Sequence, residues 1–157
     1  MKSREGVCNG RTISGFDGEA RECVNQGMYS AITRHIKVTV RPRFLAEESR
    51  PAEGRYFWAY TVEIANMGPE TVQLRSRAWE ITDENGRREE VRGAGVIGEQ
   101  PVLEPGERFE YTSGCPLGTP SGLMVGTYLM VADSGENFEV AIPAFSLDSP
   151  YAKRSVN

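Results

Sequence analysis

The sequence predicts an all-β protein: an antiparallel β-sandwich of fibronectin type III or immunoglobulin-like shape with about seven strands. Three observations predict this class. Apolar and polar residues alternate in several short segments, turn residues recur about every 10–15 residues, and no segment has the period of an amphipathic helix. Cysteines paired around a tryptophan, expected of an immunoglobulin domain proper, are missing. A small closed barrel is the alternative architecture.

The alternation is clearest in residues 35–44 and 55–66. In the first segment Ile36, Val38 and Val40 alternate with polar residues. In the second, the even-numbered positions from 56 to 64 are all apolar, which predicts a half-buried strand. The Gly-Pro pair that follows predicts a turn.

The strand expected after this turn changes register. Val72 and Leu74 are apolar on even positions, whereas Trp79 and Ile81 are apolar on odd positions. A β-bulge at residues 75–78 would explain the change, because one extra residue turns the following side chains to the opposite face.

Four further segments complete the expected sandwich. A turn at residues 83–86 leads into a polar strand, which is expected to lie at an edge or to be exposed. Residues 108–114 alternate, and residues 121–133 are apolar on both faces, which predicts a central strand covered on both sides. In the last strand Pro143 cannot donate to a ladder, so the strand either ends there or lies at an edge.

Composition limits the possible functions. The 157 residues are 39% hydrophobic, which suits one domain with a core, and the net charge of −4 argues against a nucleic-acid partner or an anionic membrane surface. No apolar run approaches the roughly 18 residues of a membrane span. Cys8, Cys23 and Cys115 are too few and too scattered for a disulfide framework, which indicates a reducing cytoplasm.

Residues 1–27 carry scattered charges and no sustained apolar period, so we expect a flexible N-terminal extension. The patterned domain is expected over residues 28–157. Met28 is the favoured natural start, which would place the preceding residues outside the natural protein; a genuine flexible extension is the alternative.

Residues 92–101, RGAGVIGEQP, contain G-x-G-x-x-G at Gly93, Gly95 and Gly98. A dinucleotide site needs this motif to follow a strand and open a helix, and Pro101 prevents a helix there. Two interpretations remain. The glycines beside Arg92 form a nest of amides for an anion, or they serve bends and close approach in a loop, which is the favoured interpretation.

No catalytic constellation is recognisable. His35 has no metal-ligating or nucleophilic partner at close spacing, and the neighbouring carboxylates of each acidic pair point to opposite faces of a strand. We therefore expect no enzyme activity, no cofactor and no metal site. Arg75, Arg77 and Trp79 share parity and form a candidate interaction surface; equally, Trp79 points into the core beyond a bulge and the arginines are solvated.

Three motifs resemble the bacterial ApaG family: W-x-I-T at residues 79–82, V-x-G-x-G-V-x-G at 91–98 and Y-T-S-G at 111–114. The similarity extends over residues 35–149. It implies a fibronectin type III-like sandwich, an association with cobalt resistance and magnesium efflux, and a pyrophosphate site at Gly93, Gly95 and Gly98. Family proteins begin shortly before the first strand, which favours Met28 as the start. Related domains in eukaryotic F-box and polymerase-interacting proteins resemble partner-binding modules.

The expected function is therefore a non-enzymatic binding domain of the bacterial cytoplasm. Its partner would be an unidentified protein, and its role would be accessory to cobalt and magnesium homeostasis. The alternative is a binder of a phosphorylated small molecule or nucleotide, held at Arg92 and the loop from Gly93 to Gly98.

Overall fold

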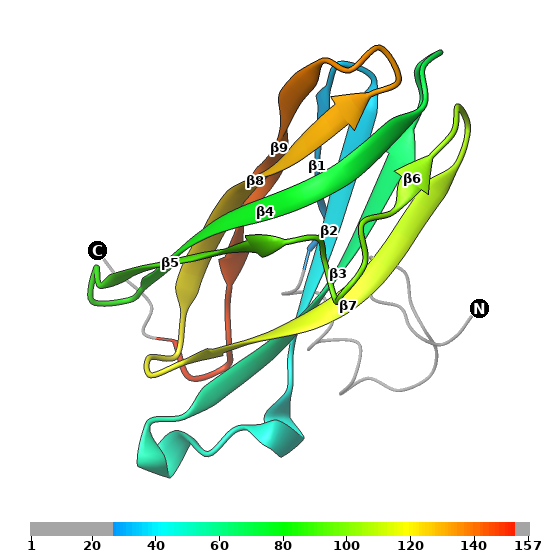
Figure 1. Ribbon diagram of the computed structural model, residues 1–157. Helices are drawn as coiled ribbons and strands as arrows, with labels where there is room; N and C mark the ends of the chain where they lie inside the picture. The colour runs from blue at the N-terminus through cyan, green and yellow to red at the C-terminus, as the bar shows by residue number, and fades with distance from the viewer. Residues whose placement is uncertain (1–26, 153–157) are drawn as a thin grey trace, which may run out of the picture.

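The computed structural model describes residues 27–152 as two antiparallel sheets packed face to face (Figure 1). Apart from Gly27, the expected N-terminal extension lies outside the described residues. One sheet has the order β1-β2-β3-β7, and its strands are Tyr29–Thr33, Ile36–Phe44, Tyr56–Asn66 and Arg108–Leu117. The other has the order β5-β4-β8-β9, and its strands are Arg88–Ala94, Val72–Asp83, Gly122–Ala132 and Asn137–Leu147. The predicted antiparallel β-sandwich is thus confirmed.

Nine strands, rather than about seven, occur in the described part of the chain. The short β6 (Val102–Leu103) pairs with the end of β4, and β1 precedes the strand with which the predicted pattern began. Arg34 (φ 49°) and His35 (φ 71°) form the two-residue turn between β1 and β2, so His35 lies in a turn and not in a strand. Two short 3-10 helices, η1 (Ala46–Glu48) and η2 (Pro51–Glu53), connect β2 to β3.

The predicted bulge in β4 is confirmed. The pairing of β4 with β8 shifts between Leu74 and Ser76, which leaves Arg75 as the extra residue. Leu74 before the bulge and Trp79 after it both point into the core, although their positions differ in parity. Each large apolar side chain buried in this way contributes about 1.5–3 kcal/mol to stability.

The central strand β8 differs from the prediction, because only one of its faces is covered. Met124, Tyr128 and Met130 are buried between the sheets. Leu123 and Leu129, on the opposite face, are 45% and 36% exposed. An apolar pattern on both faces shows which side chains tolerate burial, but whether a second layer exists depends on the rest of the chain.

The last strand, β9, continues through Pro143 to Leu147 and lies at the edge of its sheet. Its pairing with β8 shifts where Pro143 and Ala144 lie opposite the single residue Val125. The proline is therefore accommodated at a bulge in an edge strand. The edge location was predicted correctly, and the alternative, that the strand ends at Pro143, was wrong.

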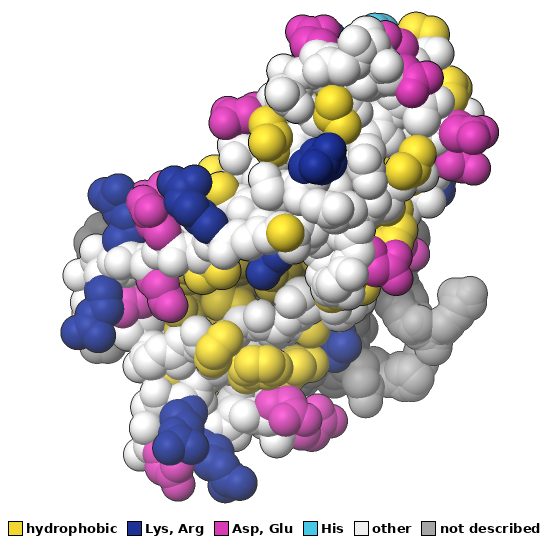
Figure 2. Space-filling model, viewed as in Figure 1, with side chains coloured by type: hydrophobic (Ala, Val, Ile, Leu, Met, Phe, Trp, Pro, Cys, Tyr) yellow, Lys and Arg dark blue, Asp and Glu magenta, His cyan; other side chains and the backbone are white. Residues whose placement is uncertain are grey.

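The two open sides of the sandwich are not alike. On one side β1 lies against β9: Ala141 N donates to Thr33 Oγ1 at 3.2 Å, and the Tyr29 hydroxyl lies 3.1 Å from Ser146 Oγ. On the other side the edge strands are β5 and β7, and no hydrogen bond or ion pair joins them among residues 27–152. Figure 2 shows a recess of hydrophobic atoms between these two strands.

Candidate functional site

The free edge of β7 forms one wall of this recess. Asn66 N donates to Glu107 O at 2.9 Å, and this pair lies one position beyond Ala65 and Arg108, the last pair of the ladder between β3 and β7. Hydrogen-bonded pairs alternate with non-bonded pairs in an antiparallel ladder. The odd residues of β7 therefore bond to β3, and the even residues turn their N–H and C=O groups outward.

The outward positions are those of Arg108, Glu110, Thr112, Gly114 and Pro116. Pro116, which has no N–H, occupies a position where a missing donor leaves the ladder intact, as expected for an edge strand. The outward N–H and C=O groups of the other four have no hydrogen-bond partner among the described residues. This edge thus offers four consecutive pairs of backbone donor and acceptor.

Side chains of β7 do not screen these groups. The Arg108 guanidinium donates to Glu63 at 2.9 Å, on the neighbouring strand β3. Glu110 accepts from Arg41 at 2.8 Å, and the Thr112 hydroxyl lies 2.8 Å from that of Thr61. All three therefore interact with side chains on the outer face of the sheet.

The three other edges are better protected. β1 and β9 lie against each other, and β9 also contains the proline bulge. The polar strand β5 was predicted to lie at an edge or to be exposed, and it lies at an edge with a row of charged side chains (Arg88, Glu89, Glu90 and Arg92). Charges on an edge strand discourage pairing with another chain. The β7 edge also carries charged residues, Arg108 and Glu110, and a proline, Pro116. Both charged side chains are paired with residues of the same sheet and the proline lies at the end of the edge, so Thr112 and Gly114 between them present an uncharged stretch.

Hydrophobic side chains line the inner wall of the opening. Tyr111 and Cys115 on β7 are buried, and Leu117 is partly buried. Ile81 and Val91 on the opposite sheet are also partly buried against the core. A side chain entering between β5 and β7 would therefore contact apolar surface on both sides.

Arg77 lies on the inner face of β4 at this opening. Its Nη1 atom donates to Ala94 O at 3.1 Å and to Gly95 O at 2.8 Å. Gly93, its partner on β5, makes room for the guanidinium: a Cβ atom at Gly93 would lie 2.9 Å from Nη1. Close approach, and not a positive φ, is the reason for glycine at this position.

Three tyrosines surround the inner end of the recess. Burial raises the pKa of Tyr60, Tyr111 and Tyr128, and the nearby charge of Arg77 lowers each of them by a smaller amount. The hydroxyls of Tyr111 and Tyr128 are hydrogen-bonded to each other inside the core. All three phenols are therefore neutral at physiological pH, and they leave the charge of Arg77 uncompensated.

Cys115 is not an activated thiol. Its side chain is 3% exposed, and burial, with a smaller contribution from the charge of Glu89, raises its pKa to about 12. A nucleophilic cysteine needs a lowered pKa and access to solvent. His35, the single histidine, lies opposite Met67 at one end of β3, whereas Cys115 lies opposite Trp58. Nine residues of extended strand separate these positions by roughly 30 Å.

The glycine motif forms a tight hairpin. Val96 and Glu99 exchange two backbone hydrogen bonds of 2.8 Å, and the two residues between them, Ile97 (φ 40°) and Gly98 (φ 79°), both have positive φ, as in a type I′ turn. Gly95 has φ 64°, and a Cβ atom there would lie 2.3 Å from Glu99 O. Both bending and close approach require glycine at this position.

The structure places the proposed anion-site residues around this hairpin. The amides of Gly95, Val96 and Glu99 already donate to backbone carbonyls. The side chain of Arg92 is 71% exposed and lies 3.7 Å from Glu90. These contacts account for the glycine spacing without an anion.

The second candidate set does not form one surface. Trp79 is 4% exposed and lies in the core, which corrects the hypothesis that it belongs to an interaction surface. The bulge separates Arg75, which is exposed, from Arg77, which is half-buried in the recess. Because the bulge changes the facing of the strand, shared parity in the sequence does not give a shared face.

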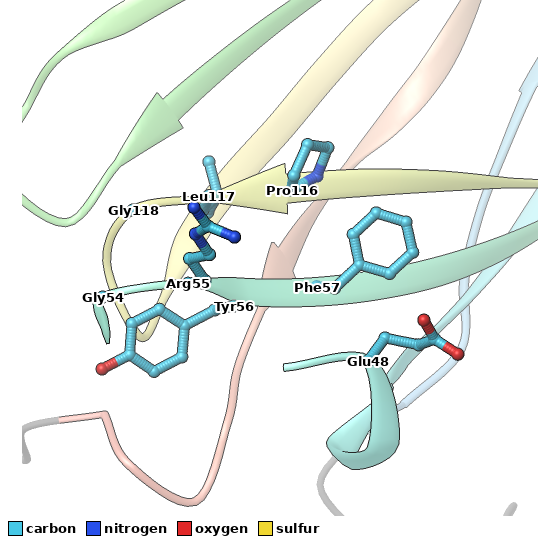
Figure 3. Close-up of a pocket in the computed structure, with 8 residues that line it drawn as sticks. All are labelled: Glu48, Gly54, Arg55, Tyr56, Phe57, Pro116, Leu117 and Gly118. Atoms are coloured by element: carbon cyan, nitrogen blue, oxygen red, sulfur yellow. The ribbon is translucent and has the colours of Figure 1, made fainter. Parts of the chain in front are cut away.

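A pocket of about 440 Å³ continues the β7 edge at its C-terminal end (Figure 3). Phe57 and Pro116 lie side by side there, with Glu48 of η1 beyond the ring and Tyr56 at the other end. Gly114 belongs to the same arrangement, because a Cβ atom on it would lie 2.6 Å from the Phe57 ring. The free edge therefore ends beside an aromatic pocket.

Residues 27–152 contain no group of three or more His, Cys, Asp or Glu side chains placed to hold a metal ion. No helix in the same part of the chain is long and apolar enough to cross a membrane.

The fold defines a fibronectin type III-like sandwich domain. Comparison with known proteins gives its family: the sequence profile of the ApaG domain matches residues 46–132. The Protein ApaG of Bradyrhizobium sp. (strain ORS 278) is 66% identical over 130 residues, which are 83% of this chain and 100% of the relative. The Protein ApaG of Rhodospirillum centenum is 65% identical over 130 residues, which are again 83% of this chain and 100% of the relative. This chain belongs to the ApaG family.

A solved structure agrees with this assignment. The crystal structure of an ApaA protein from Bordetella pertussis is 52% identical in sequence and superposes with a TM-score of 0.72. The match covers 74% of this chain and 95% of that one.

Proposed function

We propose that this protein is a non-enzymatic binding domain that pairs an extended segment of a partner protein with the free edge of β7. The observation that carries the proposal is the row of outward backbone groups on Arg108, Glu110, Thr112 and Gly114. Addition of a strand to a sheet edge is a common mode of peptide recognition. Each new backbone hydrogen bond contributes about 0.5–1.5 kcal/mol.

The shape of the opening supports this mode of binding. In an added strand, side chains would point alternately into the recess between the sheets and onto the outer face of the domain. The recess is apolar, and the aromatic pocket at Phe57 and Pro116 lies at one end of the edge. Backbone pairing would supply affinity, and these two regions would supply specificity.

The chemistry of the described residues favours binding over catalysis. The buried thiol of Cys115 is protonated, and His35 lies at the opposite end of β3. An accessory role in cobalt and magnesium homeostasis, implied by the family resemblance, would on this proposal act through the partner protein in the bacterial cytoplasm. The competing function is a phosphorylated ligand at Arg92 and the Gly93–Gly98 hairpin.

Two matched proline substitutions test the edge. Thr112→Pro removes an outward N–H of β7, and Glu90→Pro removes an outward N–H of β5. On β5 the odd residues bond to β4, because Asp83 N donates to Arg87 O, so the N–H of Glu90 points away from β4. Partners captured from a bacterial lysate by the full chain are compared with those of each variant, after equal melting temperatures are verified. Thr112→Val controls for the lost hydroxyl.

The expected result is loss of a captured protein with Thr112→Pro only. A photo-crosslinker introduced at position 112 should also join β7 to one contiguous segment of that protein. Equal capture by both proline variants would contradict the edge proposal. Stabilisation by micromolar nucleotide or pyrophosphate in a thermal-shift screen, with no partner captured, would favour the competing function.

A further inference from the structure

We propose that Arg77 is a carboxylate-binding group, and that the segment pairing with β7 inserts an Asp or Glu side chain between the two sheets to reach it. This inference rests on the proposed function and adds a requirement for the partner's sequence. Arg77 is the positive charge inside the opening, and no carboxylate lies within 4 Å of it among the described residues.

The guanidinium is held in position but keeps free donors. Only Nη1 is engaged, by the carbonyls of Ala94 and Gly95. Nε and Nη2 make no hydrogen bond with residues 27–152. Carbonyl contacts orient the group without neutralising it. A planar guanidinium with two free donors matches the geometry of a carboxylate.

The surroundings make an anion at this point favourable. Arg77 is half-buried, and its neighbours Tyr60, Tyr111 and Tyr128 are buried phenols that remain neutral. Attraction between opposite charges is stronger beside a protein interior than in water. An arginine left without a counter-charge here therefore gains more from a carboxylate than an exposed arginine such as Arg75 would.

The strand geometry connects Arg77 to the β7 edge. The inner side chains of β7, among them Tyr111 and Ser113, point toward the opposite sheet, where Arg77 lies. Residues directly opposite each other on neighbouring strands share a face. The acidic residue would therefore be one that lies opposite Tyr111 or Ser113 in the added strand.

The same opening disfavours a phosphate. Glu89 lies on the inner side of β5, and its charge helps to raise the pKa of Cys115 across the opening. A doubly charged phosphate would meet this repulsion more strongly than a single carboxylate. The apolar walls formed by Ile81, Val91 and Leu117 suit the methylene stem of an acidic side chain.

The first test uses small anions and does not depend on peptide binding. NMR resonances of the arginine Nε–H groups are followed in the full chain while sodium acetate is added. Separate titrations with sodium chloride and with sodium phosphate, at equal ionic strength, give the comparison. We expect acetate to shift the Arg77 resonance in a saturable way and to leave Arg75 nearly unchanged. Glu89→Gln should strengthen the response, and Glu90→Gln, on the outer face, should not.

The second test uses a blocked seven-residue peptide in which Thr and Val alternate around a central Glu, and its counterpart with Gln. We expect the Glu peptide to bind about tenfold more tightly, as a charge-assisted bond predicts. Arg77→Gln should remove the preference, and Arg77→Lys should retain part of it. Because these variants also affect the Ala94 and Gly95 contacts, the two peptides on the unchanged protein give the decisive comparison.

The outcomes separate the two proposals. Equal binding of both peptides, with the amides of Thr112 and Gly114 perturbed, would overturn the carboxylate site and keep the edge proposal. The site would also be overturned if acetate shifted the Arg77 resonance no more than the Arg75 resonance. The same conclusion would follow if phosphate shifted the Arg77 resonance as much as acetate did. A third outcome is also informative. If acetate shifts the Arg77 resonance specifically, but neither peptide perturbs the amides of Thr112 and Gly114, the carboxylate site is supported and edge pairing is contradicted.

Discussion

Gly93 lies against the guanidinium of Arg77, so closely that a Cβ atom at Gly93 would be 2.9 Å from Nη1. The first glycine of the G-x-G-x-x-G motif thus makes space for an arginine of the neighbouring strand. We expect Gly93→Ala to displace Arg77 and lower stability by about 1 kcal/mol or more. Urea denaturation measures the loss, and the Arg77 resonance should shift in the variant. An unchanged midpoint and resonance would show that the contact is not needed.

Gly95 and Gly98 both have positive φ, but only Gly95 is also crowded. Gly95→Ala would bring a Cβ atom to 2.3 Å from Glu99 O, whereas Gly98 has open space around it. We expect Gly98→Ala to cost about 1 kcal/mol from backbone strain and Gly95→Ala to cost clearly more. Thermal unfolding of the two variants without any anion gives the comparison. Equal costs would show that crowding at Gly95 has no effect.

Arg92→Ala should leave the ligand-free protein almost unchanged. The side chain is 71% exposed and its ion pair with Glu90 spans 3.7 Å, and such pairs contribute at most about 1 kcal/mol. The measurement is the melting temperature with and without phosphate. A phosphate-dependent stabilisation that disappears in Arg92→Ala would establish the hairpin as an anion site.

High pH should destabilise the protein through its buried phenols. The pKa of Tyr60, Tyr111 and Tyr128 is raised in the native state, so folding favours their neutral forms. Their contribution is complete below the ordinary phenol pKa of about 10 and is lost as pH rises above it. The melting temperature is measured at pH 9 and pH 11, about one unit either side of that pKa. It should fall less between these two values in Tyr128→Phe than in the parent protein. A fall as steep as in the parent would exclude this cause.

No tight cobalt or magnesium site is expected. A transition-metal site needs convergent imidazole or thiolate ligands. His35 is in the turn between β1 and β2, and Cys115 is buried in the core. Calorimetric titration of the full chain with each metal should show no stoichiometric binding at sub-micromolar concentration; such binding to cobalt would refute the prediction.

Local patterns in the sequence were enough to predict the sandwich, the β4 bulge and the exposed position of β5. They missed β1, because its Arg34–His35 turn contains neither glycine nor asparagine, and β6, because two residues have no period. The uncovered face of β8 could not be predicted either. Whether a face is covered depends on packing between distant segments.

The glycine motif was visible in the sequence, but the recess between β5 and β7 was not. The position of Arg77 depends on the bulge at Arg75 and on pairing with Gly93, two contacts between different strands. One signal for the β7 edge was present: Pro116 follows an alternating segment, and a proline within a strand indicates an edge.

Amide hydrogen exchange in β7, resolved by NMR, tests the central claim most directly. In the free protein, the amides of Glu110, Thr112 and Gly114 should exchange much faster than those of Tyr111 and Ser113, which bond to β3. In a complex with a captured partner, the fast amides should become protected while those at the β5 edge do not. Slow exchange at Thr112 and Gly114 in the free protein, or no added protection in the complex, would contradict recognition through this edge.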